Sequence, residues 1–305
     1  MRKPHIAASE SCDPSGLPAQ QPLDEGDAAA RHRHEVGAGL RFAFGRNWTR
    51  FLRYLDDARI DEAKTNLQDF LQVASLSGLT FVDIGSGSGL SSLAARYLGA
   101  AVSSFDYDTE SVACTRELKR RYFPNDPSWT ICQGSVLDQD FLRGLGEFDI
   151  VYSWGVLHHT GDMWRAMENV KPMVKPGGKL FLAIYNDFGE ISRWWLARKR
   201  RYQRLPRLLR PLYVAYLWTP QELRLLAGYL RAGELNRYIN EVFNYRKGRG
   251  MSRLHDIVDW VGGYPYEYAT LSSLIEFYQS AGFAAVKVQE NSSYGCHQVV
   301  FRRLS

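Results

Sequence analysis

The sequence predicts an α/β fold, and residues 80–95 carry most of that prediction. A short apolar run that ends at Asp83 is typical of a buried strand, alternate glycines then form a tight turn, and apolar residues resume at helical spacing. A second strand is predicted at 101–106, one helix further on. At 305 residues, one large α/β domain with additions is expected rather than two independent domains.

The glycine turn predicts a site for a small polar or charged cofactor. Gly85, Gly87 and Gly89 carry no side chains that would keep a ligand off the backbone, and the following helix offers unpaired N–H groups. The dinucleotide fingerprint needs glycine at position 90, where this chain has Leu90. The serine nucleophile elbow Gly-x-Ser-x-Gly is absent as well. Both of those alternatives are therefore disfavoured.

An acid at the end of the second strand identifies the type of turn. Asp106 follows Gly89 at about the distance of a ribose-binding carboxylate. With Asp83, Gly85 and Gly87, these residues match Asp-x-Gly-x-Gly-x-Gly and its distal acid, so the chain resembles the class I S-adenosylmethionine-dependent methyltransferases. The resemblance implies S-adenosyl-L-methionine as donor and S-adenosyl-L-homocysteine as product. It also implies a Rossmann-like, doubly wound, seven-stranded and mostly parallel sheet whose last strand is antiparallel.

The same resemblance implies a set of cofactor-contacting residues. They are Trp48, Asp83, Gly85, Ser86, Gly87, Gly89, Asp106, Tyr107, Ser135, Val136, Ser153 and Trp154. In that family the loop after the third strand lies along the adenine, often with an acid that reaches the exocyclic amine. Ser135 stands at the matching position here, and a hydroxyl is a weaker partner.

The N-terminal part of the chain is expected to lie outside the core. Residues 1–39 lack periodicity and predict a mobile tail. Residues 40–78 predict two helices that pack on the sheet, the second over 61–74. An alternative, by analogy, is that residues 44–48 form a lid whose Trp48 ring covers the cofactor.

Residues 79–187 and 269–305 predict the methyltransferase core. Further strands are expected at 129–133, 148–153 and 179–185, separated by helices. A helix over 271–282 and a closing hairpin of runs 284–288 and 297–302 complete this core.

The loop after the fourth strand is expected to be the chemical centre. Ligands of open parallel sheets bind beyond the carboxyl ends of the strands, which places Ser153 to His159 beside the reacting methyl group. Its Leu-His-His is similar to the quinone-biosynthesis-like methyltransferases, and the absence of Asn/Asp-Pro-Pro-Tyr disfavours adenine-N6 methylation. His158 and His159 are candidate bases because the histidine pKa, about 6.5, suits proton removal. An alternative is that they only pack or cap the strand end.

Residues 188–268 are too long for a simple connection and predict an inserted helical cap for substrate. From Arg193 to Arg210 the cap is basic without an acid. Three interpretations stay open: a solvated helix face, a peripheral contact with an anionic membrane, or a phosphate-binding surface for RNA or a small molecule. Pro206 and Pro211 are expected to divide this run into short helices.

The end of the cap, residues 249–268, is predicted to be rich in loops and in groups that recognise substrates. The candidate substrate contacts are Tyr185, Asn186, Arg253, His255, Tyr264 and Tyr266. His255 beside Asp256 is a further candidate for a base with its orienting partner.

The sequence thus predicts in-line methyl transfer to an O or N atom of a small molecule. Alternatives are an RNA or lipid-like quinone acceptor, or a cofactor-binding partner protein without activity. The net charge of +5 is mild, so partners have to be inferred from where the charge lies. Nucleic acid is not favoured, because the sequence contains no recognised RNA-binding module. Four scattered cysteines show no metal-ligand spacing, which predicts a metal-independent enzyme. The absence of a long apolar stretch predicts a cytoplasmic protein; the oligomeric state is not specified.

Overall fold

A computed structural model describes residues 25–249, 253–291 and 295–304. Within these residues seven strands form one sheet in the order β3-β2-β1-β4-β5-β7-β6. The strands are β1 (Thr80–Ile84), β2 (Ala101–Asp106), β3 (Trp129–Gln133), β4 (Phe148–Trp154), β5 (Val174–Tyr185), β6 (Phe283–Gln289) and β7 (Cys296–Arg303). Strand β7 is antiparallel to β5 and β6, whereas the pairs among β1 to β5 are parallel. The predicted sheet, with its antiparallel last strand, is confirmed.

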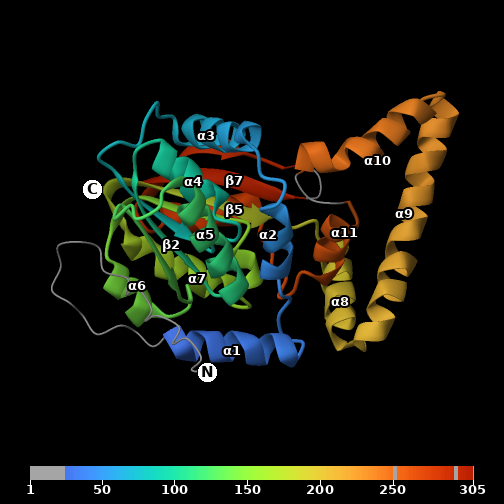
Figure 1. The fold of residues 1–305 in the computed structure, drawn as a ribbon. Coiled ribbons are helices and arrows are strands. Elements are labelled where there is room, and N and C mark those ends of the chain that lie inside the picture. The colour runs from blue at the N-terminus through green and yellow to red at the C-terminus, as the bar shows by residue number, and fades with distance from the viewer. Residues whose placement is uncertain (1–24, 250–252, 292–294, 305) are drawn as a thin grey trace, which may run out of the picture.

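Helices cover both faces of the sheet (Figure 1). One face packs against α3 (Asp57–Leu71), α4 (Leu90–Tyr97) and α5 (Thr109–Tyr122), and the other against α6 (Gln139–Leu145), α7 (Met163–Val170) and α12 (Leu271–Gln279). Side chains alternate along β1, so Phe81 packs in the core beneath α3, α4 and α5, and Val82 packs in the core beneath α6, α7 and α12. Burial on both faces explains why the central strands read as continuous apolar runs.

The N-terminal segment contains two more helices, α1 (Glu25–Gly37) and α2 (Gly45–Phe51). The expected mobile tail over 1–39 is wrong for Glu25–Gly37, and the preceding residues lie outside the described part of the chain. His32 of α1 is buried and its ring lies 5.3 Å from that of Tyr107. These contacts join residues far apart in sequence, so local periodicity gave no sign of them.

The insertion forms helices that project from one end of the body (Figure 1). They are α8 (Glu190–Arg204), α9 (Arg210–Ala232), α10 (Leu235–Arg249) and α11 (Arg253–Gly262), with a short 3₁₀ turn, η3 (Arg207–Leu209), between α8 and α9. Pro206 ends α8 as expected, but Pro211 lies in the first turn of α9, where proline is tolerated, and α9 continues for 23 residues. The segment expected to be loop-rich at 249–268 contains α11 instead.

Candidate active site

The cofactor loop, residues 85–89, joins β1 to α4 at the carboxyl edge of the sheet. Gly85, Gly87 and Gly89 have φ angles of 75°, 55° and 82°, which residues with a side chain avoid. A methyl group on Gly85 would lie 2.3 Å from a Val156 methyl, and one on Gly87 would lie 3.2 Å from the Trp48 indole. The glycines therefore let both the loop after β4 and helix α2 approach the cofactor loop.

Asp106 is held at the end of β2 beside this loop. Its carboxylate accepts hydrogen bonds from the N–H of Gly87 at 2.9 Å and from the N–H of Asp108 at 2.8 Å. Burial raises the pKa of Asp106 to about 7, although these two N–H groups favour the ionised form. The carboxylate thus lies in contact with the loop, as a ribose-binding acid requires.

Asp83 points into the interior rather than along the loop. The Ser92 hydroxyl donates to its carboxylate at 2.5 Å, and Ser92 is itself 2.7 Å from the Ser104 hydroxyl. Burial raises the pKa of Asp83 to about 6, against the effect of the Ser92 hydrogen bonds. Asp83 therefore links β1 to α4 and, through Ser92, to β2, and so stabilises the two elements that the cofactor loop connects.

Helices α1 and α2 lie over the segment that follows β2. Asp108 accepts a hydrogen bond from the N–H of Gly45 at 2.8 Å, and His32 Nε2 lies 3.7 Å from the same carboxylate. Tyr107 donates its hydroxyl to Glu35 at 3.2 Å. Together with the Trp48 ring on Gly87, these contacts place the N-terminal helices beside the carboxyl edge of the sheet.

The histidine loop, residues 155–162, follows β4 and contains the two histidines in distinct hydrogen-bonding states. The backbone N–H of Tyr185 donates to Nδ1 of His158 at 3.3 Å, so the neutral ring carries its proton on Nε2, a buried donor without a partner among the described residues. Nδ1 of His159 lies 2.5 Å from the Pro265 carbonyl and must donate, which leaves a lone pair on Nε2. The two rings therefore offer opposite functions.

Burial keeps both histidines neutral. Burial, together with the charges of Lys199 and Arg41, lowers the pKa of His159 to about 3, although the hydrogen bond to the Pro265 carbonyl acts in the opposite direction. Burial also lowers the pKa of His158 well below its usual value, assisted by His159 and Lys199. A neutral ring can accept a proton or donate a hydrogen bond. However, a pKa of about 3 makes His159 a weaker base than the ordinary histidine, with a pKa of about 6.5, on which the sequence prediction rested.

Two distant segments fix the histidine loop. Arg41 donates to the carbonyls of His159 and Thr160 at 2.7 and 3.1 Å. From the end of the insertion, Glu267 donates its N–H to the His158 carbonyl, and its carboxylate accepts the N–H groups of Gly161 and Met163 at the start of α7. The orientation of both rings thus depends on residues outside the methyltransferase core.

A cluster of aromatic and charged side chains surrounds the histidines. The ring centroids of His158 and His159 lie 3.9 and 5.5 Å from that of Tyr185, and the Tyr266 ring lies 5.3 Å from Tyr185. Lys199 is buried, donates to the Trp260 carbonyl and lies 4.8 Å from the Tyr266 ring. Tyr185 and Tyr266, two predicted substrate residues, are therefore brought to the histidines.

Three residues near this cluster were missed as site residues by sequence reasoning: Arg41, Lys199 and Asp259. Burial lowers the pKa of Lys199 to about 7 and raises that of Asp259 to about 7, and Asp259 accepts a hydrogen bond from Asn47. The sequence did contain an indication that Lys199 is buried. Lys199 lies three or four residues from neighbours that, at helical spacing, form the buried side of α8. These neighbours are Trp195 and Tyr202, and Ser192 lies one turn further along the same side. Nothing local marks Arg41 or Asp259.

The remaining predicted cofactor residues divide into two groups. Ser135 and Val136 follow the end of β3, and Ser153 lies near the end of β4, at the carboxyl edge of the sheet where the cofactor loop also lies. The Ser153 hydroxyl donates to the Ile84 carbonyl at 3.2 Å. The Trp154 ring turns the other way, because its Nε1 donates to Gln298 of β7 at 2.9 Å. Its side chain is therefore not brought to the cofactor loop, although its backbone is.

The other predicted substrate residues are mostly occupied by structural contacts. Asn186 bonds with His297 at 2.6 Å and with Asn291, and Arg253 forms a double hydrogen bond with Glu222 of α9. The Tyr264 carbonyl accepts the N–H of Phe42 at 2.8 Å, next to the histidine contact of Pro265. His255 lies in α11, and its side chain lies outside the described residues. Tyr264, like Tyr266, is adjacent in sequence to Pro265, whose carbonyl accepts the hydrogen bond from His159.

The fold and site together define a class: a doubly wound α/β domain with a glycine-rich cofactor loop and an acid at the end of its second strand. Comparison with known proteins gives the family. Residues 82–182 match the methyltransferase domain family. These residues therefore carry a methyltransferase domain, and the strand order of the sheet is that of the class I S-adenosylmethionine-dependent methyltransferases.

Individual methyltransferases are similar to part of the chain. The chain is 30% identical to a ubiquinone biosynthesis O-methyltransferase of Caulobacter vibrioides, over 37% of this chain and 43% of that one. It is 31% identical to a tRNA U34 carboxymethyltransferase of Methylococcus capsulatus, over 40% and 36%. The chain thus spans less than half the length of these curated relatives. The structure of PKMT2 from Rickettsia typhi in complex with AdoHcy shares the fold, with a TM-score of 0.50 and 13% identity over 82% and 53% of the two chains.

Over 25–249, 253–291 and 295–304, no three His, Cys, Asp or Glu side chains come together in a way that could bind a metal ion. No helix in that part of the chain has the length and apolarity needed to cross a bilayer.

Proposed function

We propose that this protein transfers the methyl group of S-adenosylmethionine to an O or N atom of a small molecule. The observation that carries the proposal is the contact between the two loops: Val156 of the histidine loop packs on Gly85 of the cofactor loop. This contact supports the proposal that a candidate base on the histidine loop acts near the cofactor-binding backbone of the cofactor loop. The proposal combines this contact with the family membership of residues 82–182.

The residues present fit the cofactor. The positive φ angles of the cofactor loop leave backbone free of side chains, and Asp106 offers a carboxylate for the ribose hydroxyls. Ser135 and Val136 would lie beside the adenine ring of the cofactor, and the Trp48 ring of α2 would cover the cofactor. When bound, S-adenosylmethionine supplies an already electrophilic methyl carbon. The protein's own task is then to position the acceptor and to remove its proton, and positioning alone contributes on the order of 7 to 11 kcal/mol at best.

The two histidines divide the remaining work. His159 Nε2, with its free lone pair, accepts the proton of the acceptor hydroxyl or amine as the new bond to carbon forms. His158 Nε2–H donates a hydrogen bond to the acceptor, which gives this buried donor the partner it lacks within the protein. Tyr185 and Tyr266 provide aromatic walls for the acceptor.

An O-methyl acceptor of apolar character is favoured within this proposal. The cluster around the histidines is built mainly of aromatic rings, and the ubiquinone-pathway relative is an O-methyltransferase. The relative that acts on tRNA keeps an RNA acceptor as the second candidate.

The test is to follow tritiated methyl groups from S-adenosylmethionine into host-cell extract and to separate aqueous small molecules, organic-soluble lipids and acid-insoluble polymer. We expect label in one of the two soluble pools. Label confined to polymer would contradict a small-molecule acceptor and favour RNA or protein. Cofactor binding without label in any pool would favour a binding protein without activity.

We expect the affinity for S-adenosylmethionine to depend on pH through Asp106. Ribose hydroxyls donate to the ionised carboxylate, and the pKa of this group is raised to about 7, so protonation at lower pH removes the acceptor. The dissociation constant at pH 6 should be about tenfold higher than at pH 8. Calorimetry at both pH values measures it.

Two variants separate Asp106 from its neighbours. Asp106→Asn should bind roughly 10- to 150-fold more weakly at pH 8 and show little pH dependence, because a hydrogen bond to a charged group is lost. Asp259→Asn should keep the pH dependence, although the pKa of Asp259 is also raised to about 7. The opposite pattern would refute the ribose assignment.

A further inference from the structure

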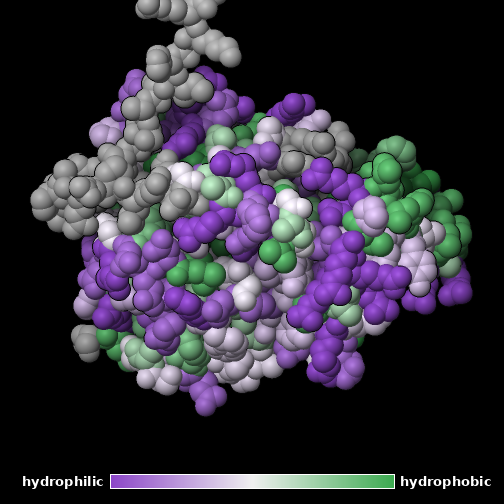
Figure 2. Space-filling model, turned by 90° about the horizontal axis from the view of Figure 1, so that it is seen from below, coloured by the Kyte–Doolittle hydropathy of each residue, from purple (hydrophilic) through white to green (hydrophobic). Residues whose placement is uncertain are grey.

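An exposed apolar surface lies on the insertion, away from the active site. We define the helical arm as residues 207–249, which comprise η3, α9 and α10. Figure 2 shows apolar side chains gathered on the side of the molecule where α9 lies in Figure 1. The most exposed are Leu208 at 89%, Phe243 at 80%, Tyr216 at 72% and Leu212 at 68%. Such a surface calls for a partner.

The apolar side chains do not form the single seam of a helix pair. Leu212, Tyr216 and Leu223 share one side of α9, since residues four and seven apart lie on the same face. Leu225, also exposed, lies nine residues beyond Tyr216, about half a turn away at about 100° per residue. Pro220 lies within the helix between them. Apolar side chains on two sides of α9 do not form the narrow stripe along which one partner helix packs.

Basic residues lie beside the apolar ones. Arg200, Arg204 and Arg207 are exposed, and no ion pair joins them to a carboxylate in the described ranges. Lys199, by contrast, is buried, so the basic run is not uniformly a solvated face. Leucines next to unpaired arginines are the composition of helices that lie on anionic membranes.

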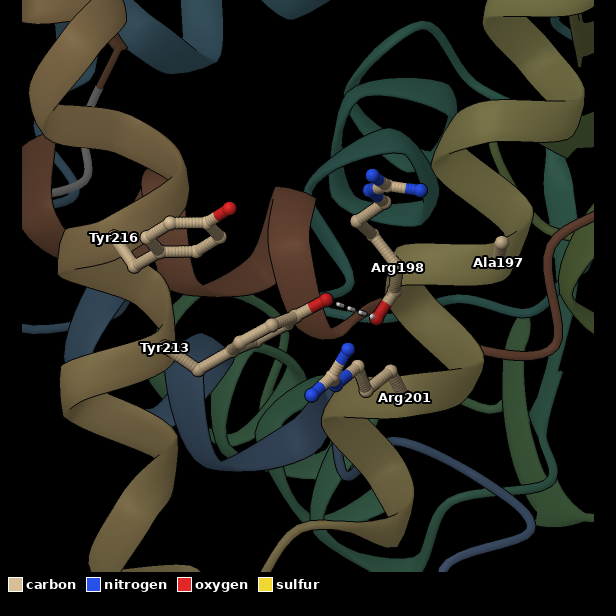
Figure 3. Close-up of a pocket in the computed structure, with 5 residues that line it drawn as sticks. All are labelled: Ala197, Arg198, Arg201, Tyr213 and Tyr216. Atoms are coloured by element: carbon tan, nitrogen blue, oxygen red, sulfur yellow. Dashed lines mark hydrogen bonds between the residues drawn. The ribbon is translucent and has the colours of Figure 1, made fainter.

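A groove between α8 and α9 fits an anionic headgroup. It has a volume of about 370 Å³ and is lined by Ala197, Arg198, Arg201, Tyr213 and Tyr216. Figure 3 shows both tyrosines reaching from α9 toward the arginine-bearing face of α8. The Tyr213 hydroxyl donates to the Arg198 carbonyl at 3.5 Å, and the Arg201 guanidinium lies 6.0 Å from the Tyr213 ring. The two arginines that line the groove carry guanidinium groups, which are suited to bind phosphate oxygens; the Arg198 guanidinium also lies 4.1 Å from the Trp194 ring.

We propose that this surface docks on an anionic lipid bilayer, with a phosphate headgroup in the Arg198–Arg201 groove and with Leu208 and Leu212 in the acyl layer. The protein lies on the membrane without crossing it, since no described helix is suited to span a bilayer. This role is separate from methyl transfer and does not depend on the acceptor.

The test is cosedimentation of the full chain with vesicles of phosphatidylcholine alone or mixed with phosphatidylglycerol. We expect binding to the mixed vesicles, weakened by salt. Arg198→Gln/Arg201→Gln should lower the affinity about 30-fold, from about 1 kcal/mol per basic residue. Leu208→Ser/Leu212→Ser should lower it at least about tenfold, because the buried apolar area is lost.

The matched control is Arg143→Gln/Arg165→Gln, which removes the same charge from exposed positions on α6 and α7. This control should bind vesicles as tightly as the unaltered protein. If it lost as much affinity as Arg198→Gln/Arg201→Gln, the headgroup site would be refuted. The variants change exposed or groove residues, so unchanged circular dichroism and melting temperature should accompany them.

Three outcomes would overturn the proposal. The first is absence of binding to either vesicle. The second is a dimer, detected by analytical ultracentrifugation without lipid, that Leu208→Ser/Leu212→Ser dissociates. The third is stronger, salt-sensitive binding to single-stranded RNA that Arg198→Gln/Arg201→Gln abolishes.

Discussion

Replacing His159 by asparagine should lower turnover by about 10²- to 10⁴-fold while leaving S-adenosylmethionine binding intact, the range expected for loss of a general base. The amide nitrogen of asparagine reaches roughly where Nδ1 lies, so the hydrogen bond to the Pro265 carbonyl is kept. The lone pair at the Nε2 position is removed. Single-turnover rates with tritiated cofactor, together with calorimetry of cofactor binding, measure the two quantities separately.

His158 provides the matched comparison. His158→Gln places an amide N–H near the Nε2 position and should lose much less activity, because the proposed donor survives. His158→Asn removes that donor, and its loss of activity should lie between the losses of His159→Asn and His158→Gln. Equal losses in His159→Asn and His158→Gln would contradict the division of roles, and unchanged turnover in His159→Asn would remove the base.

Gly85→Ala should destabilise the fold by about 2 to 5 kcal/mol and abolish measurable cofactor binding. A left-handed backbone costs a residue with a side chain roughly 1 to 2 kcal/mol, and overpacking costs typically 1 to 3 kcal/mol more. The new methyl group would meet both methyls of Val156, at 2.3 and 2.6 Å. Urea unfolding and calorimetry give the two readouts.

Gly177→Ala separates the two costs. Its φ is 76°, nearly that of Gly85, and a methyl group there meets nothing within 4 Å. This variant should lose only about 1 to 2 kcal/mol and bind cofactor normally. Adding Val156→Ala to Gly85→Ala should recover part of the stability. If Gly177→Ala were as damaging as Gly85→Ala, the contact between the two loops would not be the cause.

The core could be predicted from sequence because its signals are local. The strands at 101–106 and 129–133 were predicted with the bounds that the structure gives them. Apolar runs between glycine and proline turns define such strands without reference to the rest of the chain. The same holds for the cofactor loop, whose three glycines each carry a positive φ.

The surroundings of the histidines could not be predicted, because they depend on pairs far apart in sequence. Arg41 and His159 are 118 positions apart, and His159 and Pro265 are 106 apart. Neither Arg41 nor Pro265 stands in a motif. Lys199 was misjudged for another reason, since its charge outweighed its position in a buried helical stripe. Helix α1 was missed because its contacts with Tyr107 and Asp108 are tertiary.

The contacts of Glu267 have a consequence for exchanging parts between methyltransferases. This residue follows the inserted helices, yet its carboxylate accepts the first N–H groups of α7 in the core. A chimera joined at residues 188 and 263 would retain that bond and the Pro265 carbonyl, and would transfer only helices. One joined after 268 would remove both and leave His159 without its orienting partner. The segment that can be exchanged between enzymes therefore ends before Tyr264. The tyrosine-rich residues 264–268 have to stay with the core whose histidines they hold.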